Sequence, residues 1–212
     1  MRLPKRTTDA FMFSPSRAGG LGLPRIEDEV HIYGISTAYR LLVTSKDPTV
    51  RDTALAALGD SARKRSKGTR TLEEFLNSPP ENGEGQQGDI KSLWSRVRRS
   101  LQTCKASIGL ASSLLTIAGT DYGPLNKGVI CRAMRAVVQE GHFTRWKRAK
   151  DQGRAAECVG AHPASNHWIR GGKYTSFSEY RFAHKARLNL LPTRTVRRRS
   201  GEAIRDVSCP KC

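Results

Sequence analysis

A stretch rich in proline, glycine and polar residues, NSPPENGEGQQGD, occupies residues 77–89 and separates two parts of the sequence that carry helical patterns. Regular structure is disfavoured within it, because proline lacks a backbone N–H group and glycine loses much conformational freedom on folding. This composition is typical of a flexible linker. We therefore expect the main domain boundary of the chain at residues 77–89.

Three short helices are predicted before this linker, and they are expected to form a small helical bundle. The first follows Pro24. Its apolar stripe recurs at helical spacing and consists of Ile26, Val30, Tyr33, Thr37 and Leu41. The second begins at Asp47-Pro48, where the aspartate can cap the helix and the proline suits its first turn. The third begins at Thr71, because Thr71 and Glu74 have the spacing of a capping box.

A glycine-rich segment, RAGGLGLP, precedes the first of these helices. Gly19, Gly20 and Gly22 permit positive φ angles or a close approach of the backbone to another group. One interpretation is a loop that cradles a phosphate, but no strand precedes it and no Lys-Ser/Thr pair follows it. The sequence favours the other interpretation, a glycine turn that leads into a helix.

The part after the linker is also predicted to be helical, which makes the chain mainly α. A helix capped by Asp89 is expected to bury Ile90, Leu93, Trp94, Val97, Leu101 and Cys104. A short strand pair or a buried loop is expected within residues 106–119, ASIGLASSLLTIAG. A long helix should follow over residues 129–150. A final helix, capped by Ser176 or Ser178 and ended by Pro192, has its apolar stripe at Phe177, Tyr180, His184, Leu188 and Leu191.

The charge of the chain points to a polyanionic partner. There are 37 Lys and Arg residues against 19 Asp and Glu residues, which gives a net charge of +18. Nucleic acid is the favoured partner, because a surplus of this size repels itself unless it is neutralised. A membrane partner is not expected, since there is no run of about 20 apolar residues and no basic segment with a strongly apolar face. With five cysteines and no secretion signal at the start, we expect a reduced, nuclear protein.

Three groups of cations are the candidate nucleic-acid-binding residues, and they are Arg145, Lys147 and Arg148; Lys185 and Arg187; and Arg194, Arg197, Arg198 and Arg199. The first group lies beside Phe143 and Trp146, so an aromatic ring there could stack on a base while the cations hold phosphates. The alternative is a solvated basic helix end with Trp146 in the core. The last group is predicted to be a mostly extended arginine arm, whose guanidinium groups suit phosphate oxygens; the alternative is a solvated tail.

The sequence ends in CPKC, in which Cys209 and Cys212 have the spacing of half a zinc site. A second half within the chain would have to come from Cys158, His162 and His167, whose spacing fits no common zinc finger. A CxxC pair without metal is a further alternative. We favour a zinc knuckle of which this chain contains only the first two ligands.

No complete active site is expected, and no catalytic residue is assigned. A two-metal polymerase or nuclease needs clustered carboxylates to hold magnesium, whereas the acidic residues here are scattered and many stand at predicted helix starts. No phosphate-binding loop, zinc-protease motif or nucleophile elbow occurs.

Two segments resemble the reverse transcriptase polyproteins of LINE-type (non-LTR) retrotransposons. LPKRTTDAFMFSPSRAGGLGLPRI is similar to the segment that joins the polymerase core to the helical thumb in that family. FAHKARLNLLPTRTVRRR, followed by CPKC, is similar to the helix that precedes a Cys-Cys-His-Cys knuckle in the elements that insert site-specifically into ribosomal RNA genes. The two segments occur in the family's order, and the region between them fits only as a helical linker.

The resemblance implies a fragment of a larger enzyme. It assigns residues 1–76 to a glycine-turn segment and thumb, 77–89 to a linker, 90–208 to a basic helical linker domain, and 209–212 to the start of the knuckle. The parent polyprotein would copy the element RNA into DNA, with a nicked end of the target DNA as the primer. Its polymerase and endonuclease centres, with their magnesium ions, would lie outside this chain. This fragment would grip the template–primer duplex, with no small-molecule substrate. Cys209 and Cys212 would supply only half of a zinc site, so tight zinc binding would need the ligands that follow in the parent protein. The competing hypothesis is a self-contained basic nucleic-acid-binding protein with a structural zinc site.

Overall fold

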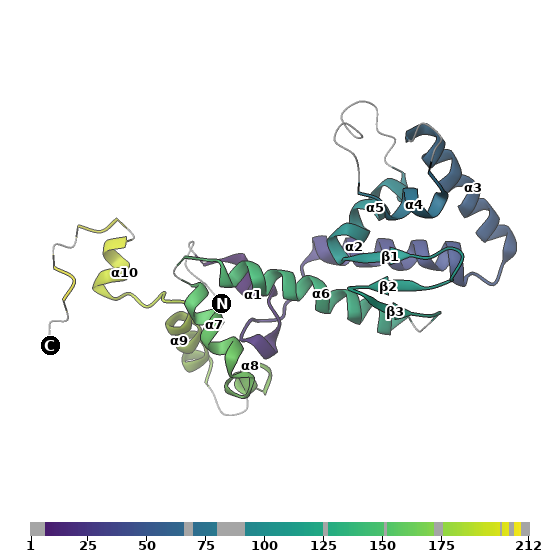
Figure 1. The fold of residues 1–212 in the computed structure, drawn as a ribbon. Helices are drawn as coiled ribbons and strands as arrows, with labels where there is room; N and C mark the ends of the chain where they lie inside the picture. The colour runs from purple at the N-terminus through teal and green to yellow at the C-terminus, as the bar shows by residue number, and fades with distance from the viewer. Residues whose placement is uncertain are drawn as a thin grey trace. The chain divides into compact units, whose positions relative to one another are not determined.

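The computed structural model describes residues 7–65, 70–79, 92–124, 127–150, 152–171, 176–199, 201–203 and 206–208. The fold is mainly α, as predicted, with one small sheet (Figure 1). In chain order the described elements are α1 (Asp9–Phe13), η1 (Ser16–Ala18), α2 (Ile26–Tyr39), η2 (Arg40–Thr44), α3 (Pro48–Arg65), α4 (Leu72–Asn77), α5 (Leu93–Cys104), β1 (Ala106–Ile108), β2 (Leu115–Ile117), β3 (Thr120–Tyr122), α6 (Lys127–Lys147), α7 (Gly153–Ala161), η3 (Pro163–Asn166), α8 (His167–Gly171), α9 (Phe177–Arg187) and α10 (Arg194–Arg199).

The chain forms two compact units, and their limits differ from the expected boundary at residues 77–89. Unit 1 consists of Met1–Leu23 and Gln139–Cys212, and unit 2 consists of Pro24–Val138. The elements on either side of the expected linker, α4 and α5, pack together in unit 2. Residues 80–89 lie outside the described residues. The linker composition at residues 77–89 therefore does not mark a boundary between the two units, because the apolar faces of α4 and α5 contribute to the same core.

Unit 2 is built around the contact between α2 and α5. Its core takes Ile32 and Ile35 from α2, and Val97 and Leu101 from α5, all fully buried. The remaining large contributors come from α3, α4, the sheet and α6, and they include Leu58, Phe75, Leu76, Ile108, Leu115 and Met134. The predicted bundle of three helices is thus completed by α5, the sheet and the first half of α6, because a bundle of only α2, α3 and α4 would leave α5 and the sheet without a core.

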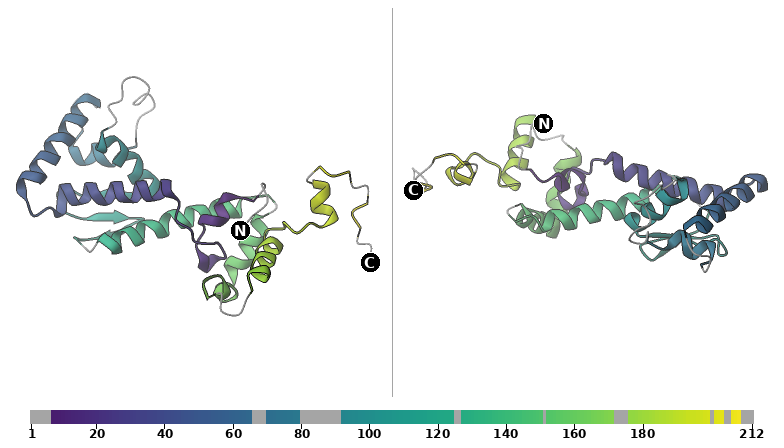
Figure 2. Two further views of the ribbon diagram at one scale, coloured as in Figure 1. Left: turned by 180° about the vertical axis from the view of Figure 1, so that it is seen from behind. Right: turned by 90° about the horizontal axis from the view of Figure 1, so that it is seen from above.

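The predicted apolar stripe of α2 is not the face that is buried. Ile26, Val30 and Tyr33 are 83%, 62% and 44% exposed, while the core face consists of Ile32, Ile35, Ala38 and Tyr39. The helix has apolar residues on both sides, so periodicity alone does not select the buried face. The exposed stripe lines a shallow groove of about 490 Å³ together with Leu93. Turning the molecule to view it from behind brings α2 to the front of unit 2 (Figure 2).

Local signals placed several helix starts correctly. The capping box of α4 is present, since the Thr71 hydroxyl accepts from the Glu74 N–H and the Glu74 carboxylate accepts from the Thr71 N–H. At the start of α3 the Asp47 carboxylate accepts from the Thr49 N–H. The cap of α5 is Ser92, which accepts from the Ser95 N–H, whereas the predicted cap Asp89 lies outside the described residues.

The region expected to hold a strand pair or a loop is a three-stranded antiparallel meander in the order β1-β2-β3. Ser107 pairs with Thr116, and Thr116 pairs with Asp121. The outer edge of β1 is closed by Asn77 at the end of α4, whose side-chain amide donates to the Ile108 carbonyl and accepts from the Ile108 N–H. An amide side chain thereby takes the place of a further strand at this edge.

Arg98 is the main buried charge of unit 2. Its side chain is 1% exposed, and its guanidinium donates to the Ser78 and Pro79 carbonyl oxygens directly after α4. The same guanidinium lies 4.2 Å from the centroid of the Phe75 ring. Arg98 therefore satisfies carbonyl groups at the end of α4 that the helix itself leaves without donors.

Unit 1 has a separate aromatic core. It contains Phe11 from α1, Phe143 and Trp146 from α6, Val159 from α7 and Leu188 after α9. The Phe11 ring lies edge-on to Trp146, with ring centroids 5.2 Å apart. The described residues before Pro24 thus pack with the C-terminal part of the chain instead of forming one domain with α2, α3 and α4.

Candidate nucleic-acid interface

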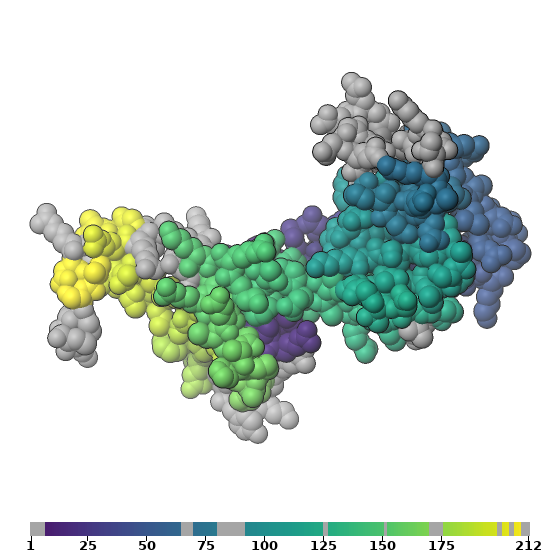
Figure 3. Space-filling model, in the orientation of Figure 1, coloured from purple at the N-terminus to yellow at the C-terminus, as the bar shows by residue number. Residues whose placement is uncertain are grey.

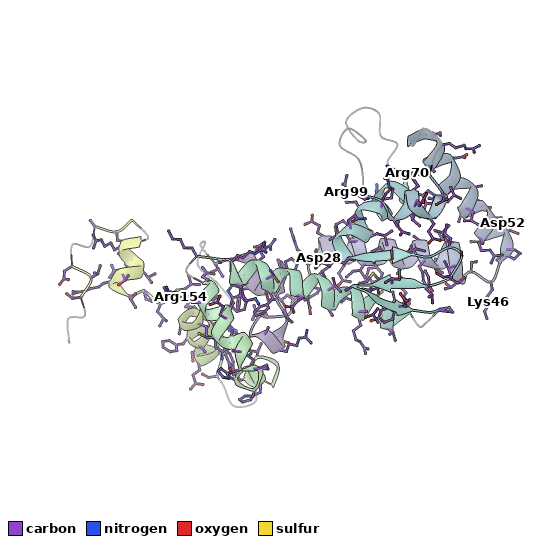
Figure 4. The ribbon with its side chains drawn as sticks, in the orientation of Figure 1. Asp28, Lys46, Asp52, Arg70, Arg99 and Arg154 are labelled. Carbon is purple, nitrogen blue, oxygen red and sulfur yellow. The ribbon has the colours of Figure 1, made fainter. Side chains whose placement is uncertain are left out.

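Positive charge is concentrated in unit 1. This unit contains 20 of the 37 Lys and Arg residues and 7 of the 19 Asp and Glu residues, so 13 of the 18 net positive charges belong to it. All the cations that sequence analysis assigned to nucleic-acid binding lie in this unit. Residues of α6 and α7 form much of its surface in the space-filling view (Figure 3). Arg154 on α7 is a further exposed cation that sequence analysis did not single out (Figure 4).

The end of α6 presents cations but no free aromatic ring. Trp146 is fully buried and Phe143 is 7% exposed, and their rings pack against each other with centroids 6.1 Å apart. Of the two interpretations that the sequence left open, an aromatic ring that stacks on a base is excluded here, and a basic helix end with Trp146 in the core is confirmed. Arg145 forms an ion pair with Asp9 at 3.0 Å, and the Lys147 ammonium lies 4.7 Å from the centroid of the Phe143 ring.

The glycine-rich segment is a turn and not a phosphate cradle. Gly19, Gly20 and Gly22 donate their N–H groups to the carbonyl oxygens of Ser16, Pro15 and Ser14, so these donors are used within the protein. Gly19 has a φ of 89°, and a Cβ atom there would lie 2.5 Å from Val159 Cγ2. Gly19 thus permits close packing of the segment on α7, and the interpretation that the sequence favoured, a glycine turn, is confirmed.

Asn166 joins three separate parts of unit 1. Its buried side-chain amide donates to the carbonyl oxygens of Arg17 and Val159, at 3.0 and 2.9 Å. Its Oδ1 atom accepts from Arg187 at 2.9 Å. Arg187 also donates to the Ser165 carbonyl and lies over the Trp168 ring, 4.7 Å from its centroid. Of the predicted nucleic-acid-binding residues, Arg187 is therefore the one most engaged in holding the fold, and burial lowers its pKa.

The arginine arm is helical over Arg194–Arg199, in contrast to the predicted extended segment. Thr193 stands at its start, where the hydroxyl accepts from the Val196 N–H. Two of its arginines have acidic neighbours, since Arg197 pairs with Glu202 at 2.6 Å and Arg194 lies 3.9 Å from Asp206. The side chain of Arg199 is outside the described residues.

Five of the predicted cations lack an acidic partner within the part of the chain that the structure describes. Two of them are engaged in other ways, Lys147 over the Phe143 ring and Arg187 with Asn166, and the other three are Arg148, Lys185 and Arg198. Arg148 at the end of α6 and Arg198 on α10 are exposed, and Lys185 on α9 is half-buried. Among the described residues, no carboxylate lies within ion-pairing distance of these three side chains. They are consequently the cations of the predicted set that have the least competition for a phosphate.

Among the described residues of unit 1, the exposed aromatic side chains lie on helix α9. Ser176 caps it in a capping box with Glu179, as one of the two predicted caps. Of the predicted stripe, His184 and Leu188 are buried, whereas Phe177 is 65% exposed. Phe182 is 61% exposed and was not singled out from the sequence. Its position opposite the buried residues of the helix is the signal that could have identified it.

His184 is enclosed by aromatic rings. Its imidazole lies 5.2 Å from Phe11, 4.9 Å from Trp168 and 4.5 Å from Tyr180, measured between ring centroids. Neither ring nitrogen has a hydrogen-bond partner among the described residues. Burial, with a smaller contribution from the charge of Arg187, lowers the pKa of His184 to about 4. The side chain is therefore neutral at pH 7 and belongs to the core of unit 1.

The predicted zinc ligands Cys209 and Cys212 lie outside the described residues. Within the described ranges, no group of three or more His, Cys, Asp or Glu side chains is arranged to hold a metal ion. Cys158, His162 and His167 are all exposed. Zinc binding at the two terminal cysteines and magnesium binding by a parent enzyme both stay predictions. No helix in the described part of the chain has the length and apolarity to cross a membrane.

Comparison with known proteins gives one partial match. A family described as the T26G10.4 domain matches residues 126–190, which include α6 to α9. The match covers less than half of the chain, and the description names no activity. No curated protein and no solved structure matches the chain significantly. The function is therefore argued from the residues and their arrangement.

Proposed function

We propose that this chain is the thumb and linker part of a LINE-type retrotransposon polyprotein, and that unit 1 holds the backbone of the element RNA and target DNA. The parent protein would carry reverse transcriptase and endonuclease activities that act on nuclear DNA, with its catalytic residues outside this chain. Cys209 and Cys212 would be the first two ligands of its zinc knuckle.

The family part of the proposal is supported by the way unit 1 is built. The two segments that resemble the family stand near opposite ends of the sequence, one containing Phe11 and the other His184. Their side chains meet in one core, with ring centroids 5.2 Å apart. If the two segments come from one protein family, they should form one structural unit in that family. The contact between Phe11 and His184 agrees with this expectation and supports the interpretation that both segments resemble the same family.

The observation that carries the nucleic-acid part is the charge of unit 1. It holds 13 of the 18 net positive charges, and Arg148, Lys185 and Arg198 are not neutralised by a described carboxylate. Cations of this kind bind phosphates without reading sequence, and each contact releases condensed counterions. We therefore expect tight binding to duplexes at low salt, a steep loss of affinity as salt rises, and little sequence preference.

The test is the salt dependence of binding by the 212-residue chain, measured by fluorescence anisotropy with an RNA–DNA hybrid and a DNA duplex. Replacing Arg148, Lys185 and Arg198 with glutamine should weaken binding and reduce the slope of log affinity against log salt by roughly 3. The matched control replaces Lys46, Arg51 and Lys64, three exposed cations of unit 2, and should leave more of the slope intact. An equal effect of both triple variants, or no binding by the unmodified chain, would refute the proposal.

The polyprotein part has an independent test in the genomic DNA on both sides of the coding sequence. An aspartate-containing polymerase motif upstream, and a His and a Cys shortly after Cys212, are expected in the same reading frame. Stop codons directly on both sides would instead favour the self-contained nucleic-acid-binding protein.

A further inference from the structure

We propose that α9 provides a stacking surface for the unpaired bases of a single-stranded nucleic acid, with Phe177 and Phe182 as the aromatic surfaces and Arg181 and Lys185 as the phosphate contacts. The inference rests on the proposed nucleic-acid function and specifies the kind of strand that this face of unit 1 binds.

The first observation is the exposure of two phenylalanine rings on one short helix. Phe177 is 65% exposed and Phe182 is 61% exposed, although unit 1 buries its other described phenylalanines wholly or in part. An exposed ring of this size forgoes the stabilisation that burial would provide. Phe182 lies on the side of α9 opposite the buried His184 and Leu188, whereas Phe177 is exposed at the first turn of the helix. Two exposed rings on one short helix indicate a binding surface.

The second observation is the placement of cations between the rings. With 3.6 residues per turn, Phe177 and Phe182 project about 140° apart around the helix, and Arg181 and Lys185 lie between them. The Arg181 guanidinium carbon lies 5.9 Å from the centroid of the Phe177 ring. A docking protein helix would need a continuous apolar stripe, whereas this pattern alternates rings and cations. Alternation of that kind matches the bases and phosphates of a nucleic-acid strand.

The charge of the surface favours an anionic partner. The acidic residue of α9 is Glu179, and its carboxylate already accepts from the Ser176 N–H at 2.7 Å in the capping box. Within the described ranges no carboxylate pairs with Arg181 or Lys185. Both cations are therefore available to phosphate oxygens.

The rings select single strands over duplexes. In a duplex the faces of the bases are covered by their stacked neighbours, so a protein ring has no base face to contact. An unpaired base of any sequence offers its face, and stacking on an aromatic side chain strengthens binding without sequence preference. Unit 1 can thus hold duplex through its cations alone, while α9 adds affinity only where bases are unpaired.

The test compares a labelled oligo(dT) of about 15 nucleotides with a DNA duplex of the same length, using the full chain. Phe182→Leu keeps an apolar side chain and removes the aromatic face, so it should weaken oligo(dT) binding about 10-fold. Phe182→Tyr keeps the face and should bind as the unmodified chain does. Duplex affinity should change by less than about twofold in both variants. Ile26→Ala, which alters an exposed apolar residue of unit 2, is the control and should change neither affinity.

The salt dependence separates rings from charges. Phe177→Leu combined with Phe182→Leu should leave the slope of log affinity against log salt unchanged on oligo(dT), whereas Lys185→Gln should reduce it by about 0.7. Oligo(dT) binding that is unaffected in the double leucine variant would overturn the stacking surface, while retained duplex binding would leave the proposed function standing. An equal loss on duplex and single strand, with an unchanged melting temperature, would also overturn it. Failure of the unmodified chain to bind either probe would overturn both proposals.

Discussion

The ring of Phe11 packs edge-on against the imidazole of His184, with centroids 5.2 Å apart and an angle of 63° between the ring planes. This contact joins the segment before α2 to helix α9, and both residues are fully buried. Sequence patterns give no indication of it, because a contact between distant segments depends on how the intervening chain folds. It explains why the N-terminal residues belong to unit 1 and why the stability of this unit should depend on pH.

The buried imidazole predicts a loss of stability in acid. The pKa of His184 is lowered to about 4 in the folded state, against 6.5 for an unperturbed histidine, because burial disfavours the charged form. Since the unfolded chain then binds the proton more readily, the stabilisation is complete above pH 6.5 and is lost as the pH falls towards 4. The loss should reach about 3 kcal/mol.

Urea denaturation between pH 7 and pH 4 measures this effect. His184→Leu should flatten the dependence of the free energy of unfolding on pH in this range, because leucine fills a similar volume and does not titrate. His162→Gln changes an exposed histidine directly after α7 and should keep the pH profile of the unmodified chain. A leucine variant with the same pH profile as the unmodified chain would show that His184 is not the group responsible.

The glycine turn gives a prediction about packing. Gly20→Ala places a Cβ atom 2.3 Å from the Ser14 carbonyl oxygen, and Gly19→Ala places one 2.5 Å from Val159 Cγ2 at a positive φ. Each substitution should lower the free energy of unfolding of unit 1 by about 1–3 kcal/mol. Gly141→Ala is the matched control, because nothing lies within 4 Å of its added Cβ atom on α6, and it should stabilise the protein by up to about 1 kcal/mol. Thermal melting of the three variants measures this difference. A lower melting temperature for the Gly19 and Gly20 variants alone would show that close packing requires these glycines, whereas equal melting temperatures for all three variants would contradict it.

Structural features that depend on neighbouring residues were predicted correctly from the sequence, whereas features that depend on contacts between distant residues were not. The capping boxes of Thr71 with Glu74 and of Ser176 with Glu179 are formed within one turn, so their patterns were sufficient. Burial of Trp146 depends on Phe11, which is distant in the sequence, so the pattern around Trp146 left burial and base stacking open.

The candidate interface shows the same limit. Composition identifies the basic segments, but it does not reveal which of their cations already have partners within the protein. Arg187 is held by Asn166 through a contact that only the packing of η3 against α9 creates. Phe182 is the opposite case, because its position opposite the predicted apolar stripe of α9 already indicated an exposed ring, and the structure shows it to be 61% exposed.

Arg98 provides a prediction for unit 2. Arg98→Met keeps the aliphatic volume but removes the donors to the Ser78 and Pro79 carbonyl oxygens and the contact with the Phe75 ring. The free energy of unfolding should fall by about 2 kcal/mol, because buried acceptors lose their partners. Arg99→Met alters the exposed neighbour on the same helix and should change stability by less than about 0.5 kcal/mol. Hydrogen exchange at the end of α4 should accelerate in the Arg98 variant alone; equal protection in both variants would contradict this role.

Binding of nucleic acid by the arginine arm can be tested by changing Glu202, because this carboxylate competes with phosphate groups for Arg197. Replacing Arg197, Arg198 and Arg199 with alanine should flatten the plot of log duplex affinity against log salt, by roughly 3 if all three contact phosphates. Arg197 is held by Glu202 at 2.6 Å, so this contact must be broken before the guanidinium binds a phosphate. Glu202→Gln should consequently strengthen duplex binding at low salt and leave the melting temperature nearly unchanged, because an exposed ion pair contributes little to stability. The same glutamine substitution combined with Arg197→Ala should give no gain, since the released cation is absent. If Glu202→Gln strengthened binding equally in the presence and absence of Arg197, the effect would come from the removed negative charge alone, and Arg197 would have no place in the interface.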